Sequence, residues 1–355
     1  MERLTAEFVK HNLNFIKPAK TSRDTLTEKE TYFIVLREDT DSEVYGIGEC
    51  SFIAGLSIDN PNDFESQLAL LCTKINEEGT ADVDFDFDAY PGIEFGLEMA
   101  IMDLENGGKR MYFEDNEFYN CERDIAINGL IWMGTTTEVT EQIDALLAKD
   151  FKTLKLKIGS LDISEDLALL KYIRSKYSSS EVEIRLDANG AFTADEVMDV
   201  LTKLSEFDIH SIEQPIQAGN WEVMADLVKK SPIDIALDEE LIGVTDPAEK
   251  EKMLKTIRPQ YIILKPSLLG GFGLAEEWME IADDLHISYW VTSALESNIG
   301  LNAIAQWVAD LDLTRPQGLG TGKLYSNNIP SPLTLDEGFL RYNTDKDWDI
   351  DVLDI

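Results

Sequence analysis

The sequence predicts an α/β fold, a modified TIM-type (β/α)7β barrel that carries a smaller α+β capping domain. Short apolar runs that each end in charge recur at intervals of about 25 to 30 residues, which suits a strand followed by a helix. Helical patterns separate these runs, as parallel strands require. The carboxyl ends of barrel strands meet at one face, so charges at those ends converge on one site. The charged positions are Lys155 and Lys157, Asp187, Glu213, Asp238 and Lys265.

Residues 1–120 are predicted to form the α+β capping domain, because the chain of 355 residues exceeds the roughly 250 that one barrel needs. Apolar runs at 4–16 and 30–39 and a glycine-rich stretch at 45–56 predict antiparallel strands. Helical patterns start near Asn62 and Tyr90, and the second suits a helix that has Pro91 in its first turn and ends before Gly107.

Residues 121–323 are predicted to form the barrel, and residues 324–355, which lose the repeat, are expected to pack back on the capping domain. Alternation of strand-like runs with helical stretches such as SEDLALLKYIRSKY supports this division. The predicted strands are 125–131, 153–158, 182–186, 209–212, 233–237, 261–264, 288–292 and a weak eighth at 316–319.

The composition excludes some classes of function. A formal net charge of -37 argues against binding to nucleic acid, since contacts to phosphate need clustered Lys and Arg. Residues 1–20 contain no apolar run of a signal peptide, and no later run is long enough to span a membrane. The three cysteines, Cys50, Cys72 and Cys121, are widely spaced and suit a reducing cytoplasm. We expect a soluble cytoplasmic protein, and the sequence makes no prediction of its oligomeric state.

Lys155 and Lys157 are one residue apart in a predicted strand, so both side chains project to the same face. A second cation nearby disfavours protonation of an amine, which prepares that amine to act as a base. The alternative is a pair of surface lysines on a short edge strand. Lys265 ends the sixth strand, on the far side of the barrel from Lys157. A substrate between them would have an amine on each face.

Asp187, Glu213 and Asp238 end three consecutive predicted strands. Three carboxylates at one site repel one another unless a cation lies between them, and ligands that are all oxygen favour Mg²⁺, with Mn²⁺ also possible. Asn189 and Glu239 are expected to contact these ligands without binding the ion themselves. The alternative is three unrelated caps at strand ends. A divalent ion with two flanking lysines suits removal of a proton next to a carboxylate and stabilisation of the resulting enediolate.

The chain resembles the enolase superfamily, in its branch with lysines on the second and sixth barrel strands. The matching stretches are KLKIG, LDANG, IEQP, LDEE, KPSLLGG, TSALESNIG and GLGTG, which cover almost all of the barrel. Within the branch, the last three stretches are similar to the o-succinylbenzoate synthase family of dehydratases, which act in menaquinone biosynthesis.

The resemblance implies roles for the charged residues. Lys157 would remove the α-proton and then assist departure of hydroxide, with Lys155 as its neighbour. Asp187, Glu213 and Asp238 would bind Mg²⁺, and Lys265 would stabilise the enolate. The substrate implied is a small dicarboxylate, a succinyl-hydroxycyclohexadiene carboxylate that becomes aromatic when it loses water.

Other residues are predicted to contact the substrate. Gly320, within a run of glycines, can present backbone N–H groups to a carboxylate, and Thr321 adjoins it. Ser293 and Glu296 follow the seventh strand, where a helix cap followed by a first-turn acid is an equal alternative. Two loops, at 20–25 and 49–57, resemble lid segments of the family. Phe52 would present apolar surface from the second, and Arg23 in the first is either a carboxylate partner or simply exposed.

Two other functions stay open. Racemisation of N-succinylamino acids or epimerisation of dipeptides would use the same two lysines to move a proton between faces. The dipeptide epimerases of the family carry an Asp-x-Asp after the eighth strand, where this chain has GLGTG. A barrel without catalytic activity, a scaffold or metal-binding protein, would be expected to lack one of the lysines or ligands, and this chain has them all.

Overall fold

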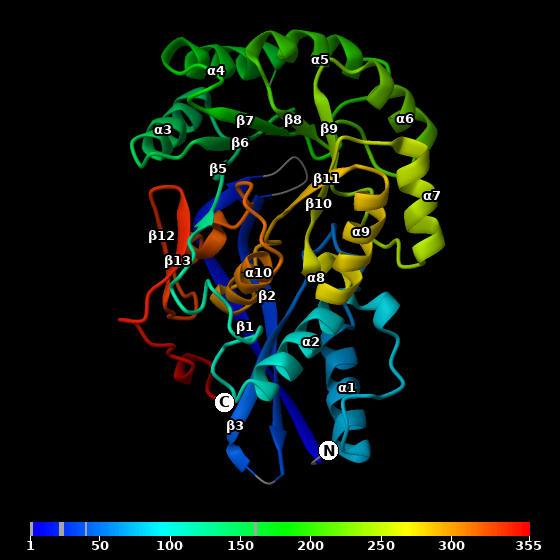
Figure 1. Cartoon of the computed structure of the whole chain (residues 1–355), viewed down its shortest axis with the longest axis vertical. Helices are drawn as coiled ribbons and strands as arrows, with labels where there is room; N and C mark the ends of the chain where they lie inside the picture. The colour runs from blue at the N-terminus through cyan, green and yellow to red at the C-terminus, as the bar shows by residue number, and fades with distance from the viewer. Residues whose placement is uncertain (1–2, 21–24, 40, 160–161) are drawn as a thin grey trace.

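A three-stranded antiparallel sheet with two helices against it forms the amino-terminal part of the molecule (Figure 1). The structure is a computed structural model that describes residues 3–20, 25–39, 41–159 and 162–355. The strands are β1 (Leu4–Lys20), β2 (Thr25–Glu38) and β3 (Asp41–Ser51). The helices are α1 (Phe64–Glu78) and α2 (Pro91–Glu105), with the short 3-10 helix η1 (Phe87–Ala89) between them. The predicted antiparallel strands and both predicted helices are therefore present.

Strand β2 is the shared wall between two hydrophobic cores. Because side chains alternate across a strand, Tyr32 and Ile34 face a core made with α1 and α2, whereas Phe33 and Val35 belong to the core of the barrel. Helix α2 crosses β3 at very short range, since a Cβ on Gly48 would lie 1.8 Å from the carbonyl oxygen of Gly96. The amino-terminal part is thus continuous with the barrel.

The second part is a parallel sheet of seven strands in the order β5 to β11, joined by helices. Its strands are β5 (Gly129–Ile131), β6 (Thr153–Lys157), β7 (Glu183–Asp187), β8 (Ser211–Glu213), β9 (Asp234–Leu237), β10 (Tyr261–Leu264) and β11 (Ser288–Val291). Isolated parallel bridges from Ile127 to Gln317 and from Thr292 to Gly318 bring residues 317–318 to the eighth position. The predicted (β/α)7β barrel with a capping sheet is confirmed.

Helices cover the outside of this barrel, and α3 to α7 arch over one end of the long axis while the amino-terminal sheet lies at the other (Figure 1). The helices are α3 (Thr136–Leu147), α4 (Ile163–Lys176), α5 (Val197–Leu204), α6 (Trp221–Lys230), α7 (Pro247–Ile257), α8 (Pro266–Leu269), α9 (Phe272–Asp284) and α10 (Asn298–Asp310), with 3-10 turns η2 (Ser205–Phe207), η3 (Gly320–Lys323) and η4 (Asp351–Leu353). Within the described ranges, every helix is too short or too polar to serve as a membrane span.

The first predicted barrel strand, 125–131, is wrong as one element, because the chain changes sheets within it. Strand β4 (Ile125–Ala126) pairs with β13 (Phe339–Tyr342), which in turn pairs with β12 (Leu333–Asp336). Only β5 pairs with β6. The change of partner follows Ala126, since the next residue bridges to Gln317.

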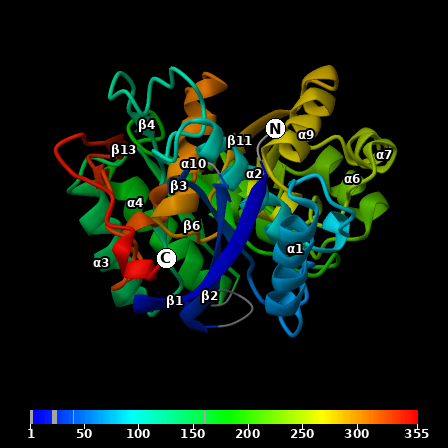
Figure 2. The same ribbon diagram turned by 90° about the horizontal axis from the view of Figure 1, so that it is seen from below.

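The carboxyl-terminal segment contacts both parts of the molecule. The Leu324 carbonyl accepts a hydrogen bond from the Ile16 N–H (2.8 Å), and the Ser326 N–H donates to Asn14 in β1 (2.9 Å). Further on, the β12–β13 hairpin adds to the short strand β4. Seen from below, the carboxyl-terminal segment and α1 lie on opposite sides of β1 and β2 (Figure 2). The division at residues 120 and 323 stays a prediction.

Candidate active site

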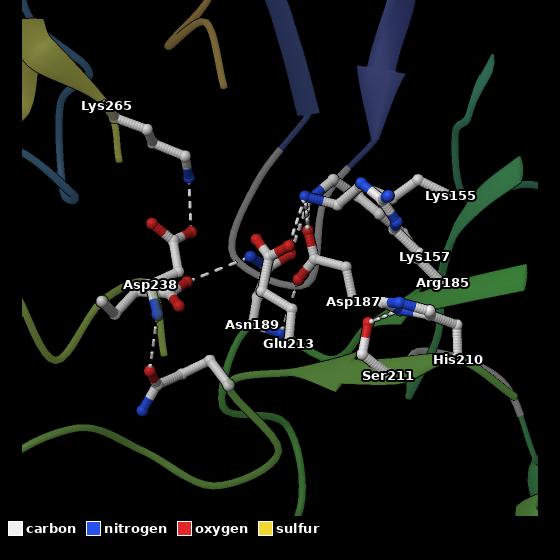
Figure 3. Close-up of polar contacts among 12 residues, drawn as sticks. Lys155, Lys157, Arg185, Asp187, Asn189, His210, Ser211, Glu213, Asp238 and Lys265 are labelled. Carbon is white, nitrogen blue, oxygen red and sulfur yellow. Dashed lines mark hydrogen bonds and ion pairs between the residues drawn. The ribbon is translucent and has the colours of Figure 1, made fainter. Parts of the chain in front are cut away.

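The register of the parallel strands brings the predicted charged residues together. Lys157 is level with Asp187, and Asp187 is level with Glu213 in the next strand. Asp238 and Lys265 directly follow β9 and β10. In Figure 3 the lysines at the ends of β6 and β10 approach from opposite sides, with the three carboxylates between them. The structure thus places Lys155 and Lys157 on an inner strand of the sheet and not on an edge strand, and it brings the three carboxylates together.

Each lysine is paired with a carboxylate. Lys155 Nζ lies 3.0 Å from Asp187 and 2.6 Å from Glu213, and Lys157 Nζ lies 2.8 Å from Asp187. Lys265 forms a short ion pair with Asp238. The three carboxylates are buried, with at most 2% of each residue exposed. The ion pairs thus hold opposite charges together at largely buried positions.

These neighbours shift the protonation equilibria of the site. Burial alone would lower the pKa of Lys155, but the charges of Asp187 and Glu213 outweigh it and raise that pKa above its usual value. The pKa of Lys265 is raised in the same way, burial being outweighed by Asp238 and Glu213. For Lys155, therefore, the expectation that a neighbouring lysine would disfavour protonation is wrong in this arrangement, because the carboxylates are closer partners.

The two carboxylates beside Lys155 differ from each other. Burial raises the pKa of Asp187, but Lys155 and Lys157 outweigh burial and hold it far below the usual range. Burial and the negative charge of Asp187 raise the pKa of Glu213 well above its usual value, although Lys155 opposes them. Of these two carboxylates, Glu213 is thus the one whose negative charge is less well compensated, and its ionised form needs additional positive charge.

The donor set fits a divalent cation in its chemistry. All three predicted ligands offer oxygen atoms, as Mg²⁺ prefers, and the buried Glu213 Oε1 accepts no hydrogen bond from the described residues. In the structure, the three carboxylates are instead paired with lysine side chains. Within the described ranges, no three acidic, histidine or cysteine side chains stand close enough together to hold an ion. An ion would therefore displace the ammonium groups of Lys155 and Lys265 from the carboxylates.

Asn189 links Lys157 to Glu239 through hydrogen bonds. Asn189 Oδ1 accepts a hydrogen bond from Lys157 Nζ (2.7 Å), and its Nδ2 donates to Glu239 Oε1 (3.0 Å). The backbone of Asn189 has a positive φ of 46° and its N–H donates to Asp187 Oδ1. This turn holds Lys157 and Asp187 in a fixed relation.

A pocket opens above the lysines. Its floor contains Lys155, Lys157, Asp187, Asn189 and Lys265. Apolar side chains from the second predicted lid loop and from the strand ends cover the other side: Leu26, Ile53, Ala54, Leu56, Leu130, Trp132, Ala294 and Leu295. The pocket therefore suits a small molecule with one anionic end and an apolar body.

The predicted substrate-binding residues divide into two groups. Ser293, Gly320 and Thr321 line the pocket, and the hydroxyls of Ser293 and Thr321 lie 2.9 Å apart. Glu296 lies behind Ser293 and accepts its hydrogen bond at 2.5 Å. Phe52 packs in the capping core against Phe64, with ring centroids 4.6 Å apart, and its neighbour Ile53 faces the pocket instead. Arg23 lies outside the described residues.

Sequence reasoning missed one wall of the pocket. Asn128, Leu130 and Trp132 alternate along β5 and its flanking residues, so all three face inward. Thr292, which directly follows β11, is also part of the wall. A signal was present, since a polar residue at the second position of an otherwise apolar INGLIW run is unusual for a buried strand.

Comparison with known proteins agrees with this geometry. The family model described as enolase C-terminal domain-like matches residues 138–346, over half of the chain. An o-succinylbenzoate synthase from Desulfotalea psychrophila is 44% identical over 371 residues, which cover 96% of this chain and 99% of that protein.

Solved structures give the same result. The crystal structure of MenC from Desulfotalea psychrophila has a TM-score of 0.84 at 42% identity, covering 96% of this chain and 100% of that one. An L-Ala-D/L-Glu epimerase from Bacillus subtilis has a TM-score of 0.79 at 20% identity and covers 96% of each chain, which shows a shared fold alone. This chain belongs to the enolase superfamily and, within it, to the o-succinylbenzoate synthase family.

Proposed function

We propose that the chain dehydrates 2-succinyl-6-hydroxy-2,4-cyclohexadiene-1-carboxylate to 2-succinylbenzoate, a step of menaquinone biosynthesis. The observation that carries the proposal is that Lys157 and Lys265 line the same pocket and approach the buried carboxylates from opposite sides. The 44% sequence identity of this chain to a protein named o-succinylbenzoate synthase supports the same substrate. As in the sequence prediction, we propose the cytoplasm as the place of the reaction.

Lys157 is the proposed base. In its neutral form its amine takes the proton from the ring carbon that bears the carboxylate, and the electron pair of that C–H bond moves into the carboxylate to give an enediolate. The pair then returns to form the new ring double bond as the C–OH bond breaks. Hydroxide leaves with the proton that Lys157 had taken, so that water is lost and the ring becomes aromatic. Asn189 holds the Nζ of Lys157 at 2.7 Å and keeps it directed at the pocket.

Lys265 is the proposed electrostatic stabiliser. Its ammonium group puts a cation on the face opposite Lys157, where it opposes the negative charge that the enediolate acquires. Lys155 lies two residues before Lys157 on the same face, and while no ion is bound its ammonium group pairs with Asp187 and Glu213. The charges of the site are thus in place before the proton is removed.

Asp187, Glu213 and Asp238 are proposed to hold Mg²⁺, or Mn²⁺ in its place, with Asn189 and Glu239 supporting them. When bound, the ion would neutralise the carboxylate of the substrate and so make the α-proton more acidic. Ser293, Thr321 and the backbone at Gly320 are proposed to contact the succinyl arm, and Glu296 to fix the direction of the Ser293 hydroxyl. We still propose Arg23 and Phe52 as residues of the lid loops. Phe52 would act through its packing.

The test is an ultraviolet assay of aromatisation with Mg²⁺ present. Lys157→Ala and Lys265→Ala are each expected to lower kcat by at least about 1,000-fold, because each removes a group that acts in the transition state. Lys152→Ala is the matched control, since Lys152 is exposed, pairs with Asp150, and lies outside the pocket. Full activity of both variants would contradict the proposal.

Racemisation is distinguished in the same samples. If the Mg²⁺-loaded protein exchanged α-deuterium into N-succinylamino acids or dipeptides faster than it aromatised the cyclohexadiene acid, the racemase or epimerase would replace the dehydratase as the main activity. Residues 316–324, which take the place of the eighth strand and the turn after it, contain no acidic side chain that could hold a substrate amine. This absence favours the dehydratase.

A further inference from the structure

Three consecutive backbone N–H groups at the wall of the pocket have no hydrogen-bond partner among the described residues. They belong to Ala294, Leu295 and Glu296, and at most 9% of each residue is exposed. The N–H groups on either side, those of Ser293 and Ser297, both donate within the protein. Buried N–H groups in folded proteins are almost always paired. Because Ala294 and Leu295 line the pocket, a bound ligand can supply the missing partner.

Leu295 has a left-handed backbone conformation, which turns the peptide group that follows it. Its φ is 66°, in a region that disfavours leucine by roughly tenfold because the Cβ comes too close to the backbone. The carbonyl of Leu295 accepts a hydrogen bond from the hydroxyl of Tyr325 (2.7 Å), which lies outside the pocket lining. The carbonyl is therefore directed away from the pocket. Since the C=O and N–H of a trans peptide point in opposite directions, the Glu296 N–H is turned toward the pocket.

Tyr325 is held in place by the capping sheet. Its ring packs on that of Phe15 in β1 with centroids 4.7 Å apart, and the two residues form an antiparallel bridge. Only 5% of Tyr325 is exposed. The hydroxyl therefore has a fixed position from which it holds the Leu295 carbonyl. This hydrogen bond stabilises a backbone conformation that leucine disfavours, and such conformations persist where the surrounding structure imposes them.

The hydroxyl groups beside this peptide already donate within the protein. Ser293 donates its one hydroxyl proton to Glu296 Oε2, at 2.5 Å. The hydroxyls of Ser293 and Thr321 lie 2.9 Å apart, so Thr321 is the donor of that hydrogen bond. Both protons thus belong to a chain that ends on the Glu296 carboxylate, whose other oxygen accepts from Ser267. The backbone N–H groups are left as donors for a ligand.

The three N–H groups suit an anion. Successive N–H groups next to a left-handed residue form a concave site with positive partial charge. A carboxylate has two oxygen atoms that each accept more than one hydrogen bond, so one carboxylate can satisfy several donors together. The side chain of Glu296 does not fill this role, because its two oxygens are bonded to Ser267 and Ser293.

We propose that the backbone N–H groups of Ala294, Leu295 and Glu296 bind the terminal carboxylate of the succinyl arm, and that Tyr325 is the positioning residue that turns the last of them toward it. This inference rests on the proposed function, since it takes the arm of that substrate as the ligand. An N-succinylamino acid carries the same terminal carboxylate and would use the same donors. The carboxyl-terminal segment thus serves substrate binding through a residue that does not line the pocket.

The test compares two ligands that differ only at the end of the arm. The product 2-succinylbenzoate has the terminal carboxylate, and 2-butanoylbenzoate has a methyl group in its place. We expect the Mg²⁺-loaded protein to bind 2-succinylbenzoate at least about tenfold more tightly by calorimetry, because the methyl group leaves the buried N–H groups unpaired. In Tyr325→Phe, which loses only the hydroxyl, this preference should fall to about threefold or less, through weaker binding of 2-succinylbenzoate.

Substitutions of Leu295 separate positioning from packing. Glycine adopts a positive φ without cost, so Leu295→Gly should keep the preference, and Leu295→Gly/Tyr325→Phe should restore it to at least about fivefold. A β-branched side chain resists a positive φ, so Leu295→Val should lower the preference although Tyr325 is intact. Tyr32→Phe is the matched control and should keep the full preference, because Tyr32 is a buried tyrosine outside the pocket whose hydroxyl donates to Glu65.

Three results would overturn the inference. They are an unmodified protein without any preference, a folded Tyr325→Phe protein with an unchanged preference, and a loss in Tyr325→Phe that Leu295→Gly does not restore. If Tyr325→Phe does not fold, Leu295→Val decides the result, and an unchanged preference there would overturn the inference. Failure of the unmodified protein to aromatise the substrate or to bind the product would instead contradict the proposed function.

Discussion

Lys155 is the cation that separates two buried carboxylates at the centre of the site. Its ammonium group contacts both Asp187 and Glu213, and its side chain is 6% exposed. Sequence alone predicted that Lys155 and Lys157 share a face, because that follows from the period of a strand. It could not predict which carboxylates each lysine would contact, because the contacts depend on the register between strands that are 30 residues apart.

Replacement of Lys155 by Met is expected to make stability depend on Mg²⁺. Without the ion, the variant leaves two buried carboxylates without their cation, which should lower the free energy of unfolding by about 3–5 kcal/mol. With Mg²⁺ in excess, part of that loss should be recovered, because the ion takes the place of the ammonium group. Urea unfolding in EDTA and in Mg²⁺ measures both values.

Lys152→Met serves as the control for this experiment, since its side chain is 67% exposed and should change stability by less than about 0.5 kcal/mol in either buffer. An equal loss for Lys155→Met with and without Mg²⁺ would mean that Asp187 and Glu213 do not bind the ion.

At the scale of elements, carboxylates of the amino-terminal part are fixed at the N-termini of three helices. Glu49 of β3 accepts hydrogen bonds from the N–H groups of Ser297, directly before α10, and of Gly300 in α10. Glu98 of α2 accepts from the N–H groups of Phe272 and Gly273 in α9. Helix N-termini favour negative charge, so these contacts hold the capping sheet against the face of the barrel that carries the lysines.

The sequence pattern did not reveal these contacts. The contacts of Glu49 and Glu98 join positions more than 170 residues apart, and an exposed acidic residue and an anchoring one look alike in a sequence. The sequence stretches KPSLLGG and SNIG resemble those of a family, but the sequence does not explain why glycine is needed at these positions. The structure gives the reason for one of them, since a Cβ on Gly271, whose φ is 110°, would lie 2.2 Å from Glu98 Oε2.

Asp59 is the third of these carboxylates, and its contribution to stability should depend on pH. Its Oδ1 accepts the Gly92 N–H at the start of α2, but its Oδ2 is buried without a partner among the described residues. Burial raises the pKa of Asp59 to about 7, only partly opposed by the Gly92 hydrogen bond. Because this pKa lies above the usual value near 4, the protonated carboxyl stabilises the fold in acid, and that contribution is lost as the pH rises through about 7.

Asp59→Asn should therefore gain stability relative to the unmodified protein as the pH rises. We expect the difference in unfolding free energy to grow by up to about 1.4 kcal/mol per pH unit between roughly pH 4 and pH 7, and to level off above that. Urea unfolding at pH 5 and pH 8 measures the change. Asp82→Asn, on an exposed side chain, is the control. A difference that is the same at both pH values would show that Asp59 does not ionise in this range.

At the scale of the whole molecule, the capping sheet and the barrel share one wall. The barrel architecture was predictable because its repeat of apolar run, charge and helix is written locally in the sequence. The shared wall was not, since the run TYFIVL of β2 looks like any strand buried on both faces. Only the structure assigns Tyr32 and Ile34 to one core and Phe33 and Val35 to the other.

Phe33→Ala is expected to destabilise the barrel, although Phe33 belongs to the capping sheet. Its ring is fully buried in the barrel core, so its loss should cost about 3–5 kcal/mol of unfolding free energy. All six tryptophans, the first of which is Trp132, follow the predicted capping domain of residues 1–120, so tryptophan fluorescence reports on the unfolding of the rest of the chain.

The fluorescence transition of Phe33→Ala should shift to lower urea concentration and coincide with the transition seen by far-ultraviolet circular dichroism. Leu70→Ala, an exposed position on α1, should leave both transitions within about 0.5 kcal/mol of the unmodified protein. If the capping sheet unfolded on its own, Phe33→Ala would shift the circular dichroism transition and leave the fluorescence transition in place. Coincident shifts would mean that the lid loops are carried by a sheet that does not unfold without the barrel, as the core shared through Phe33 and Val35 predicts.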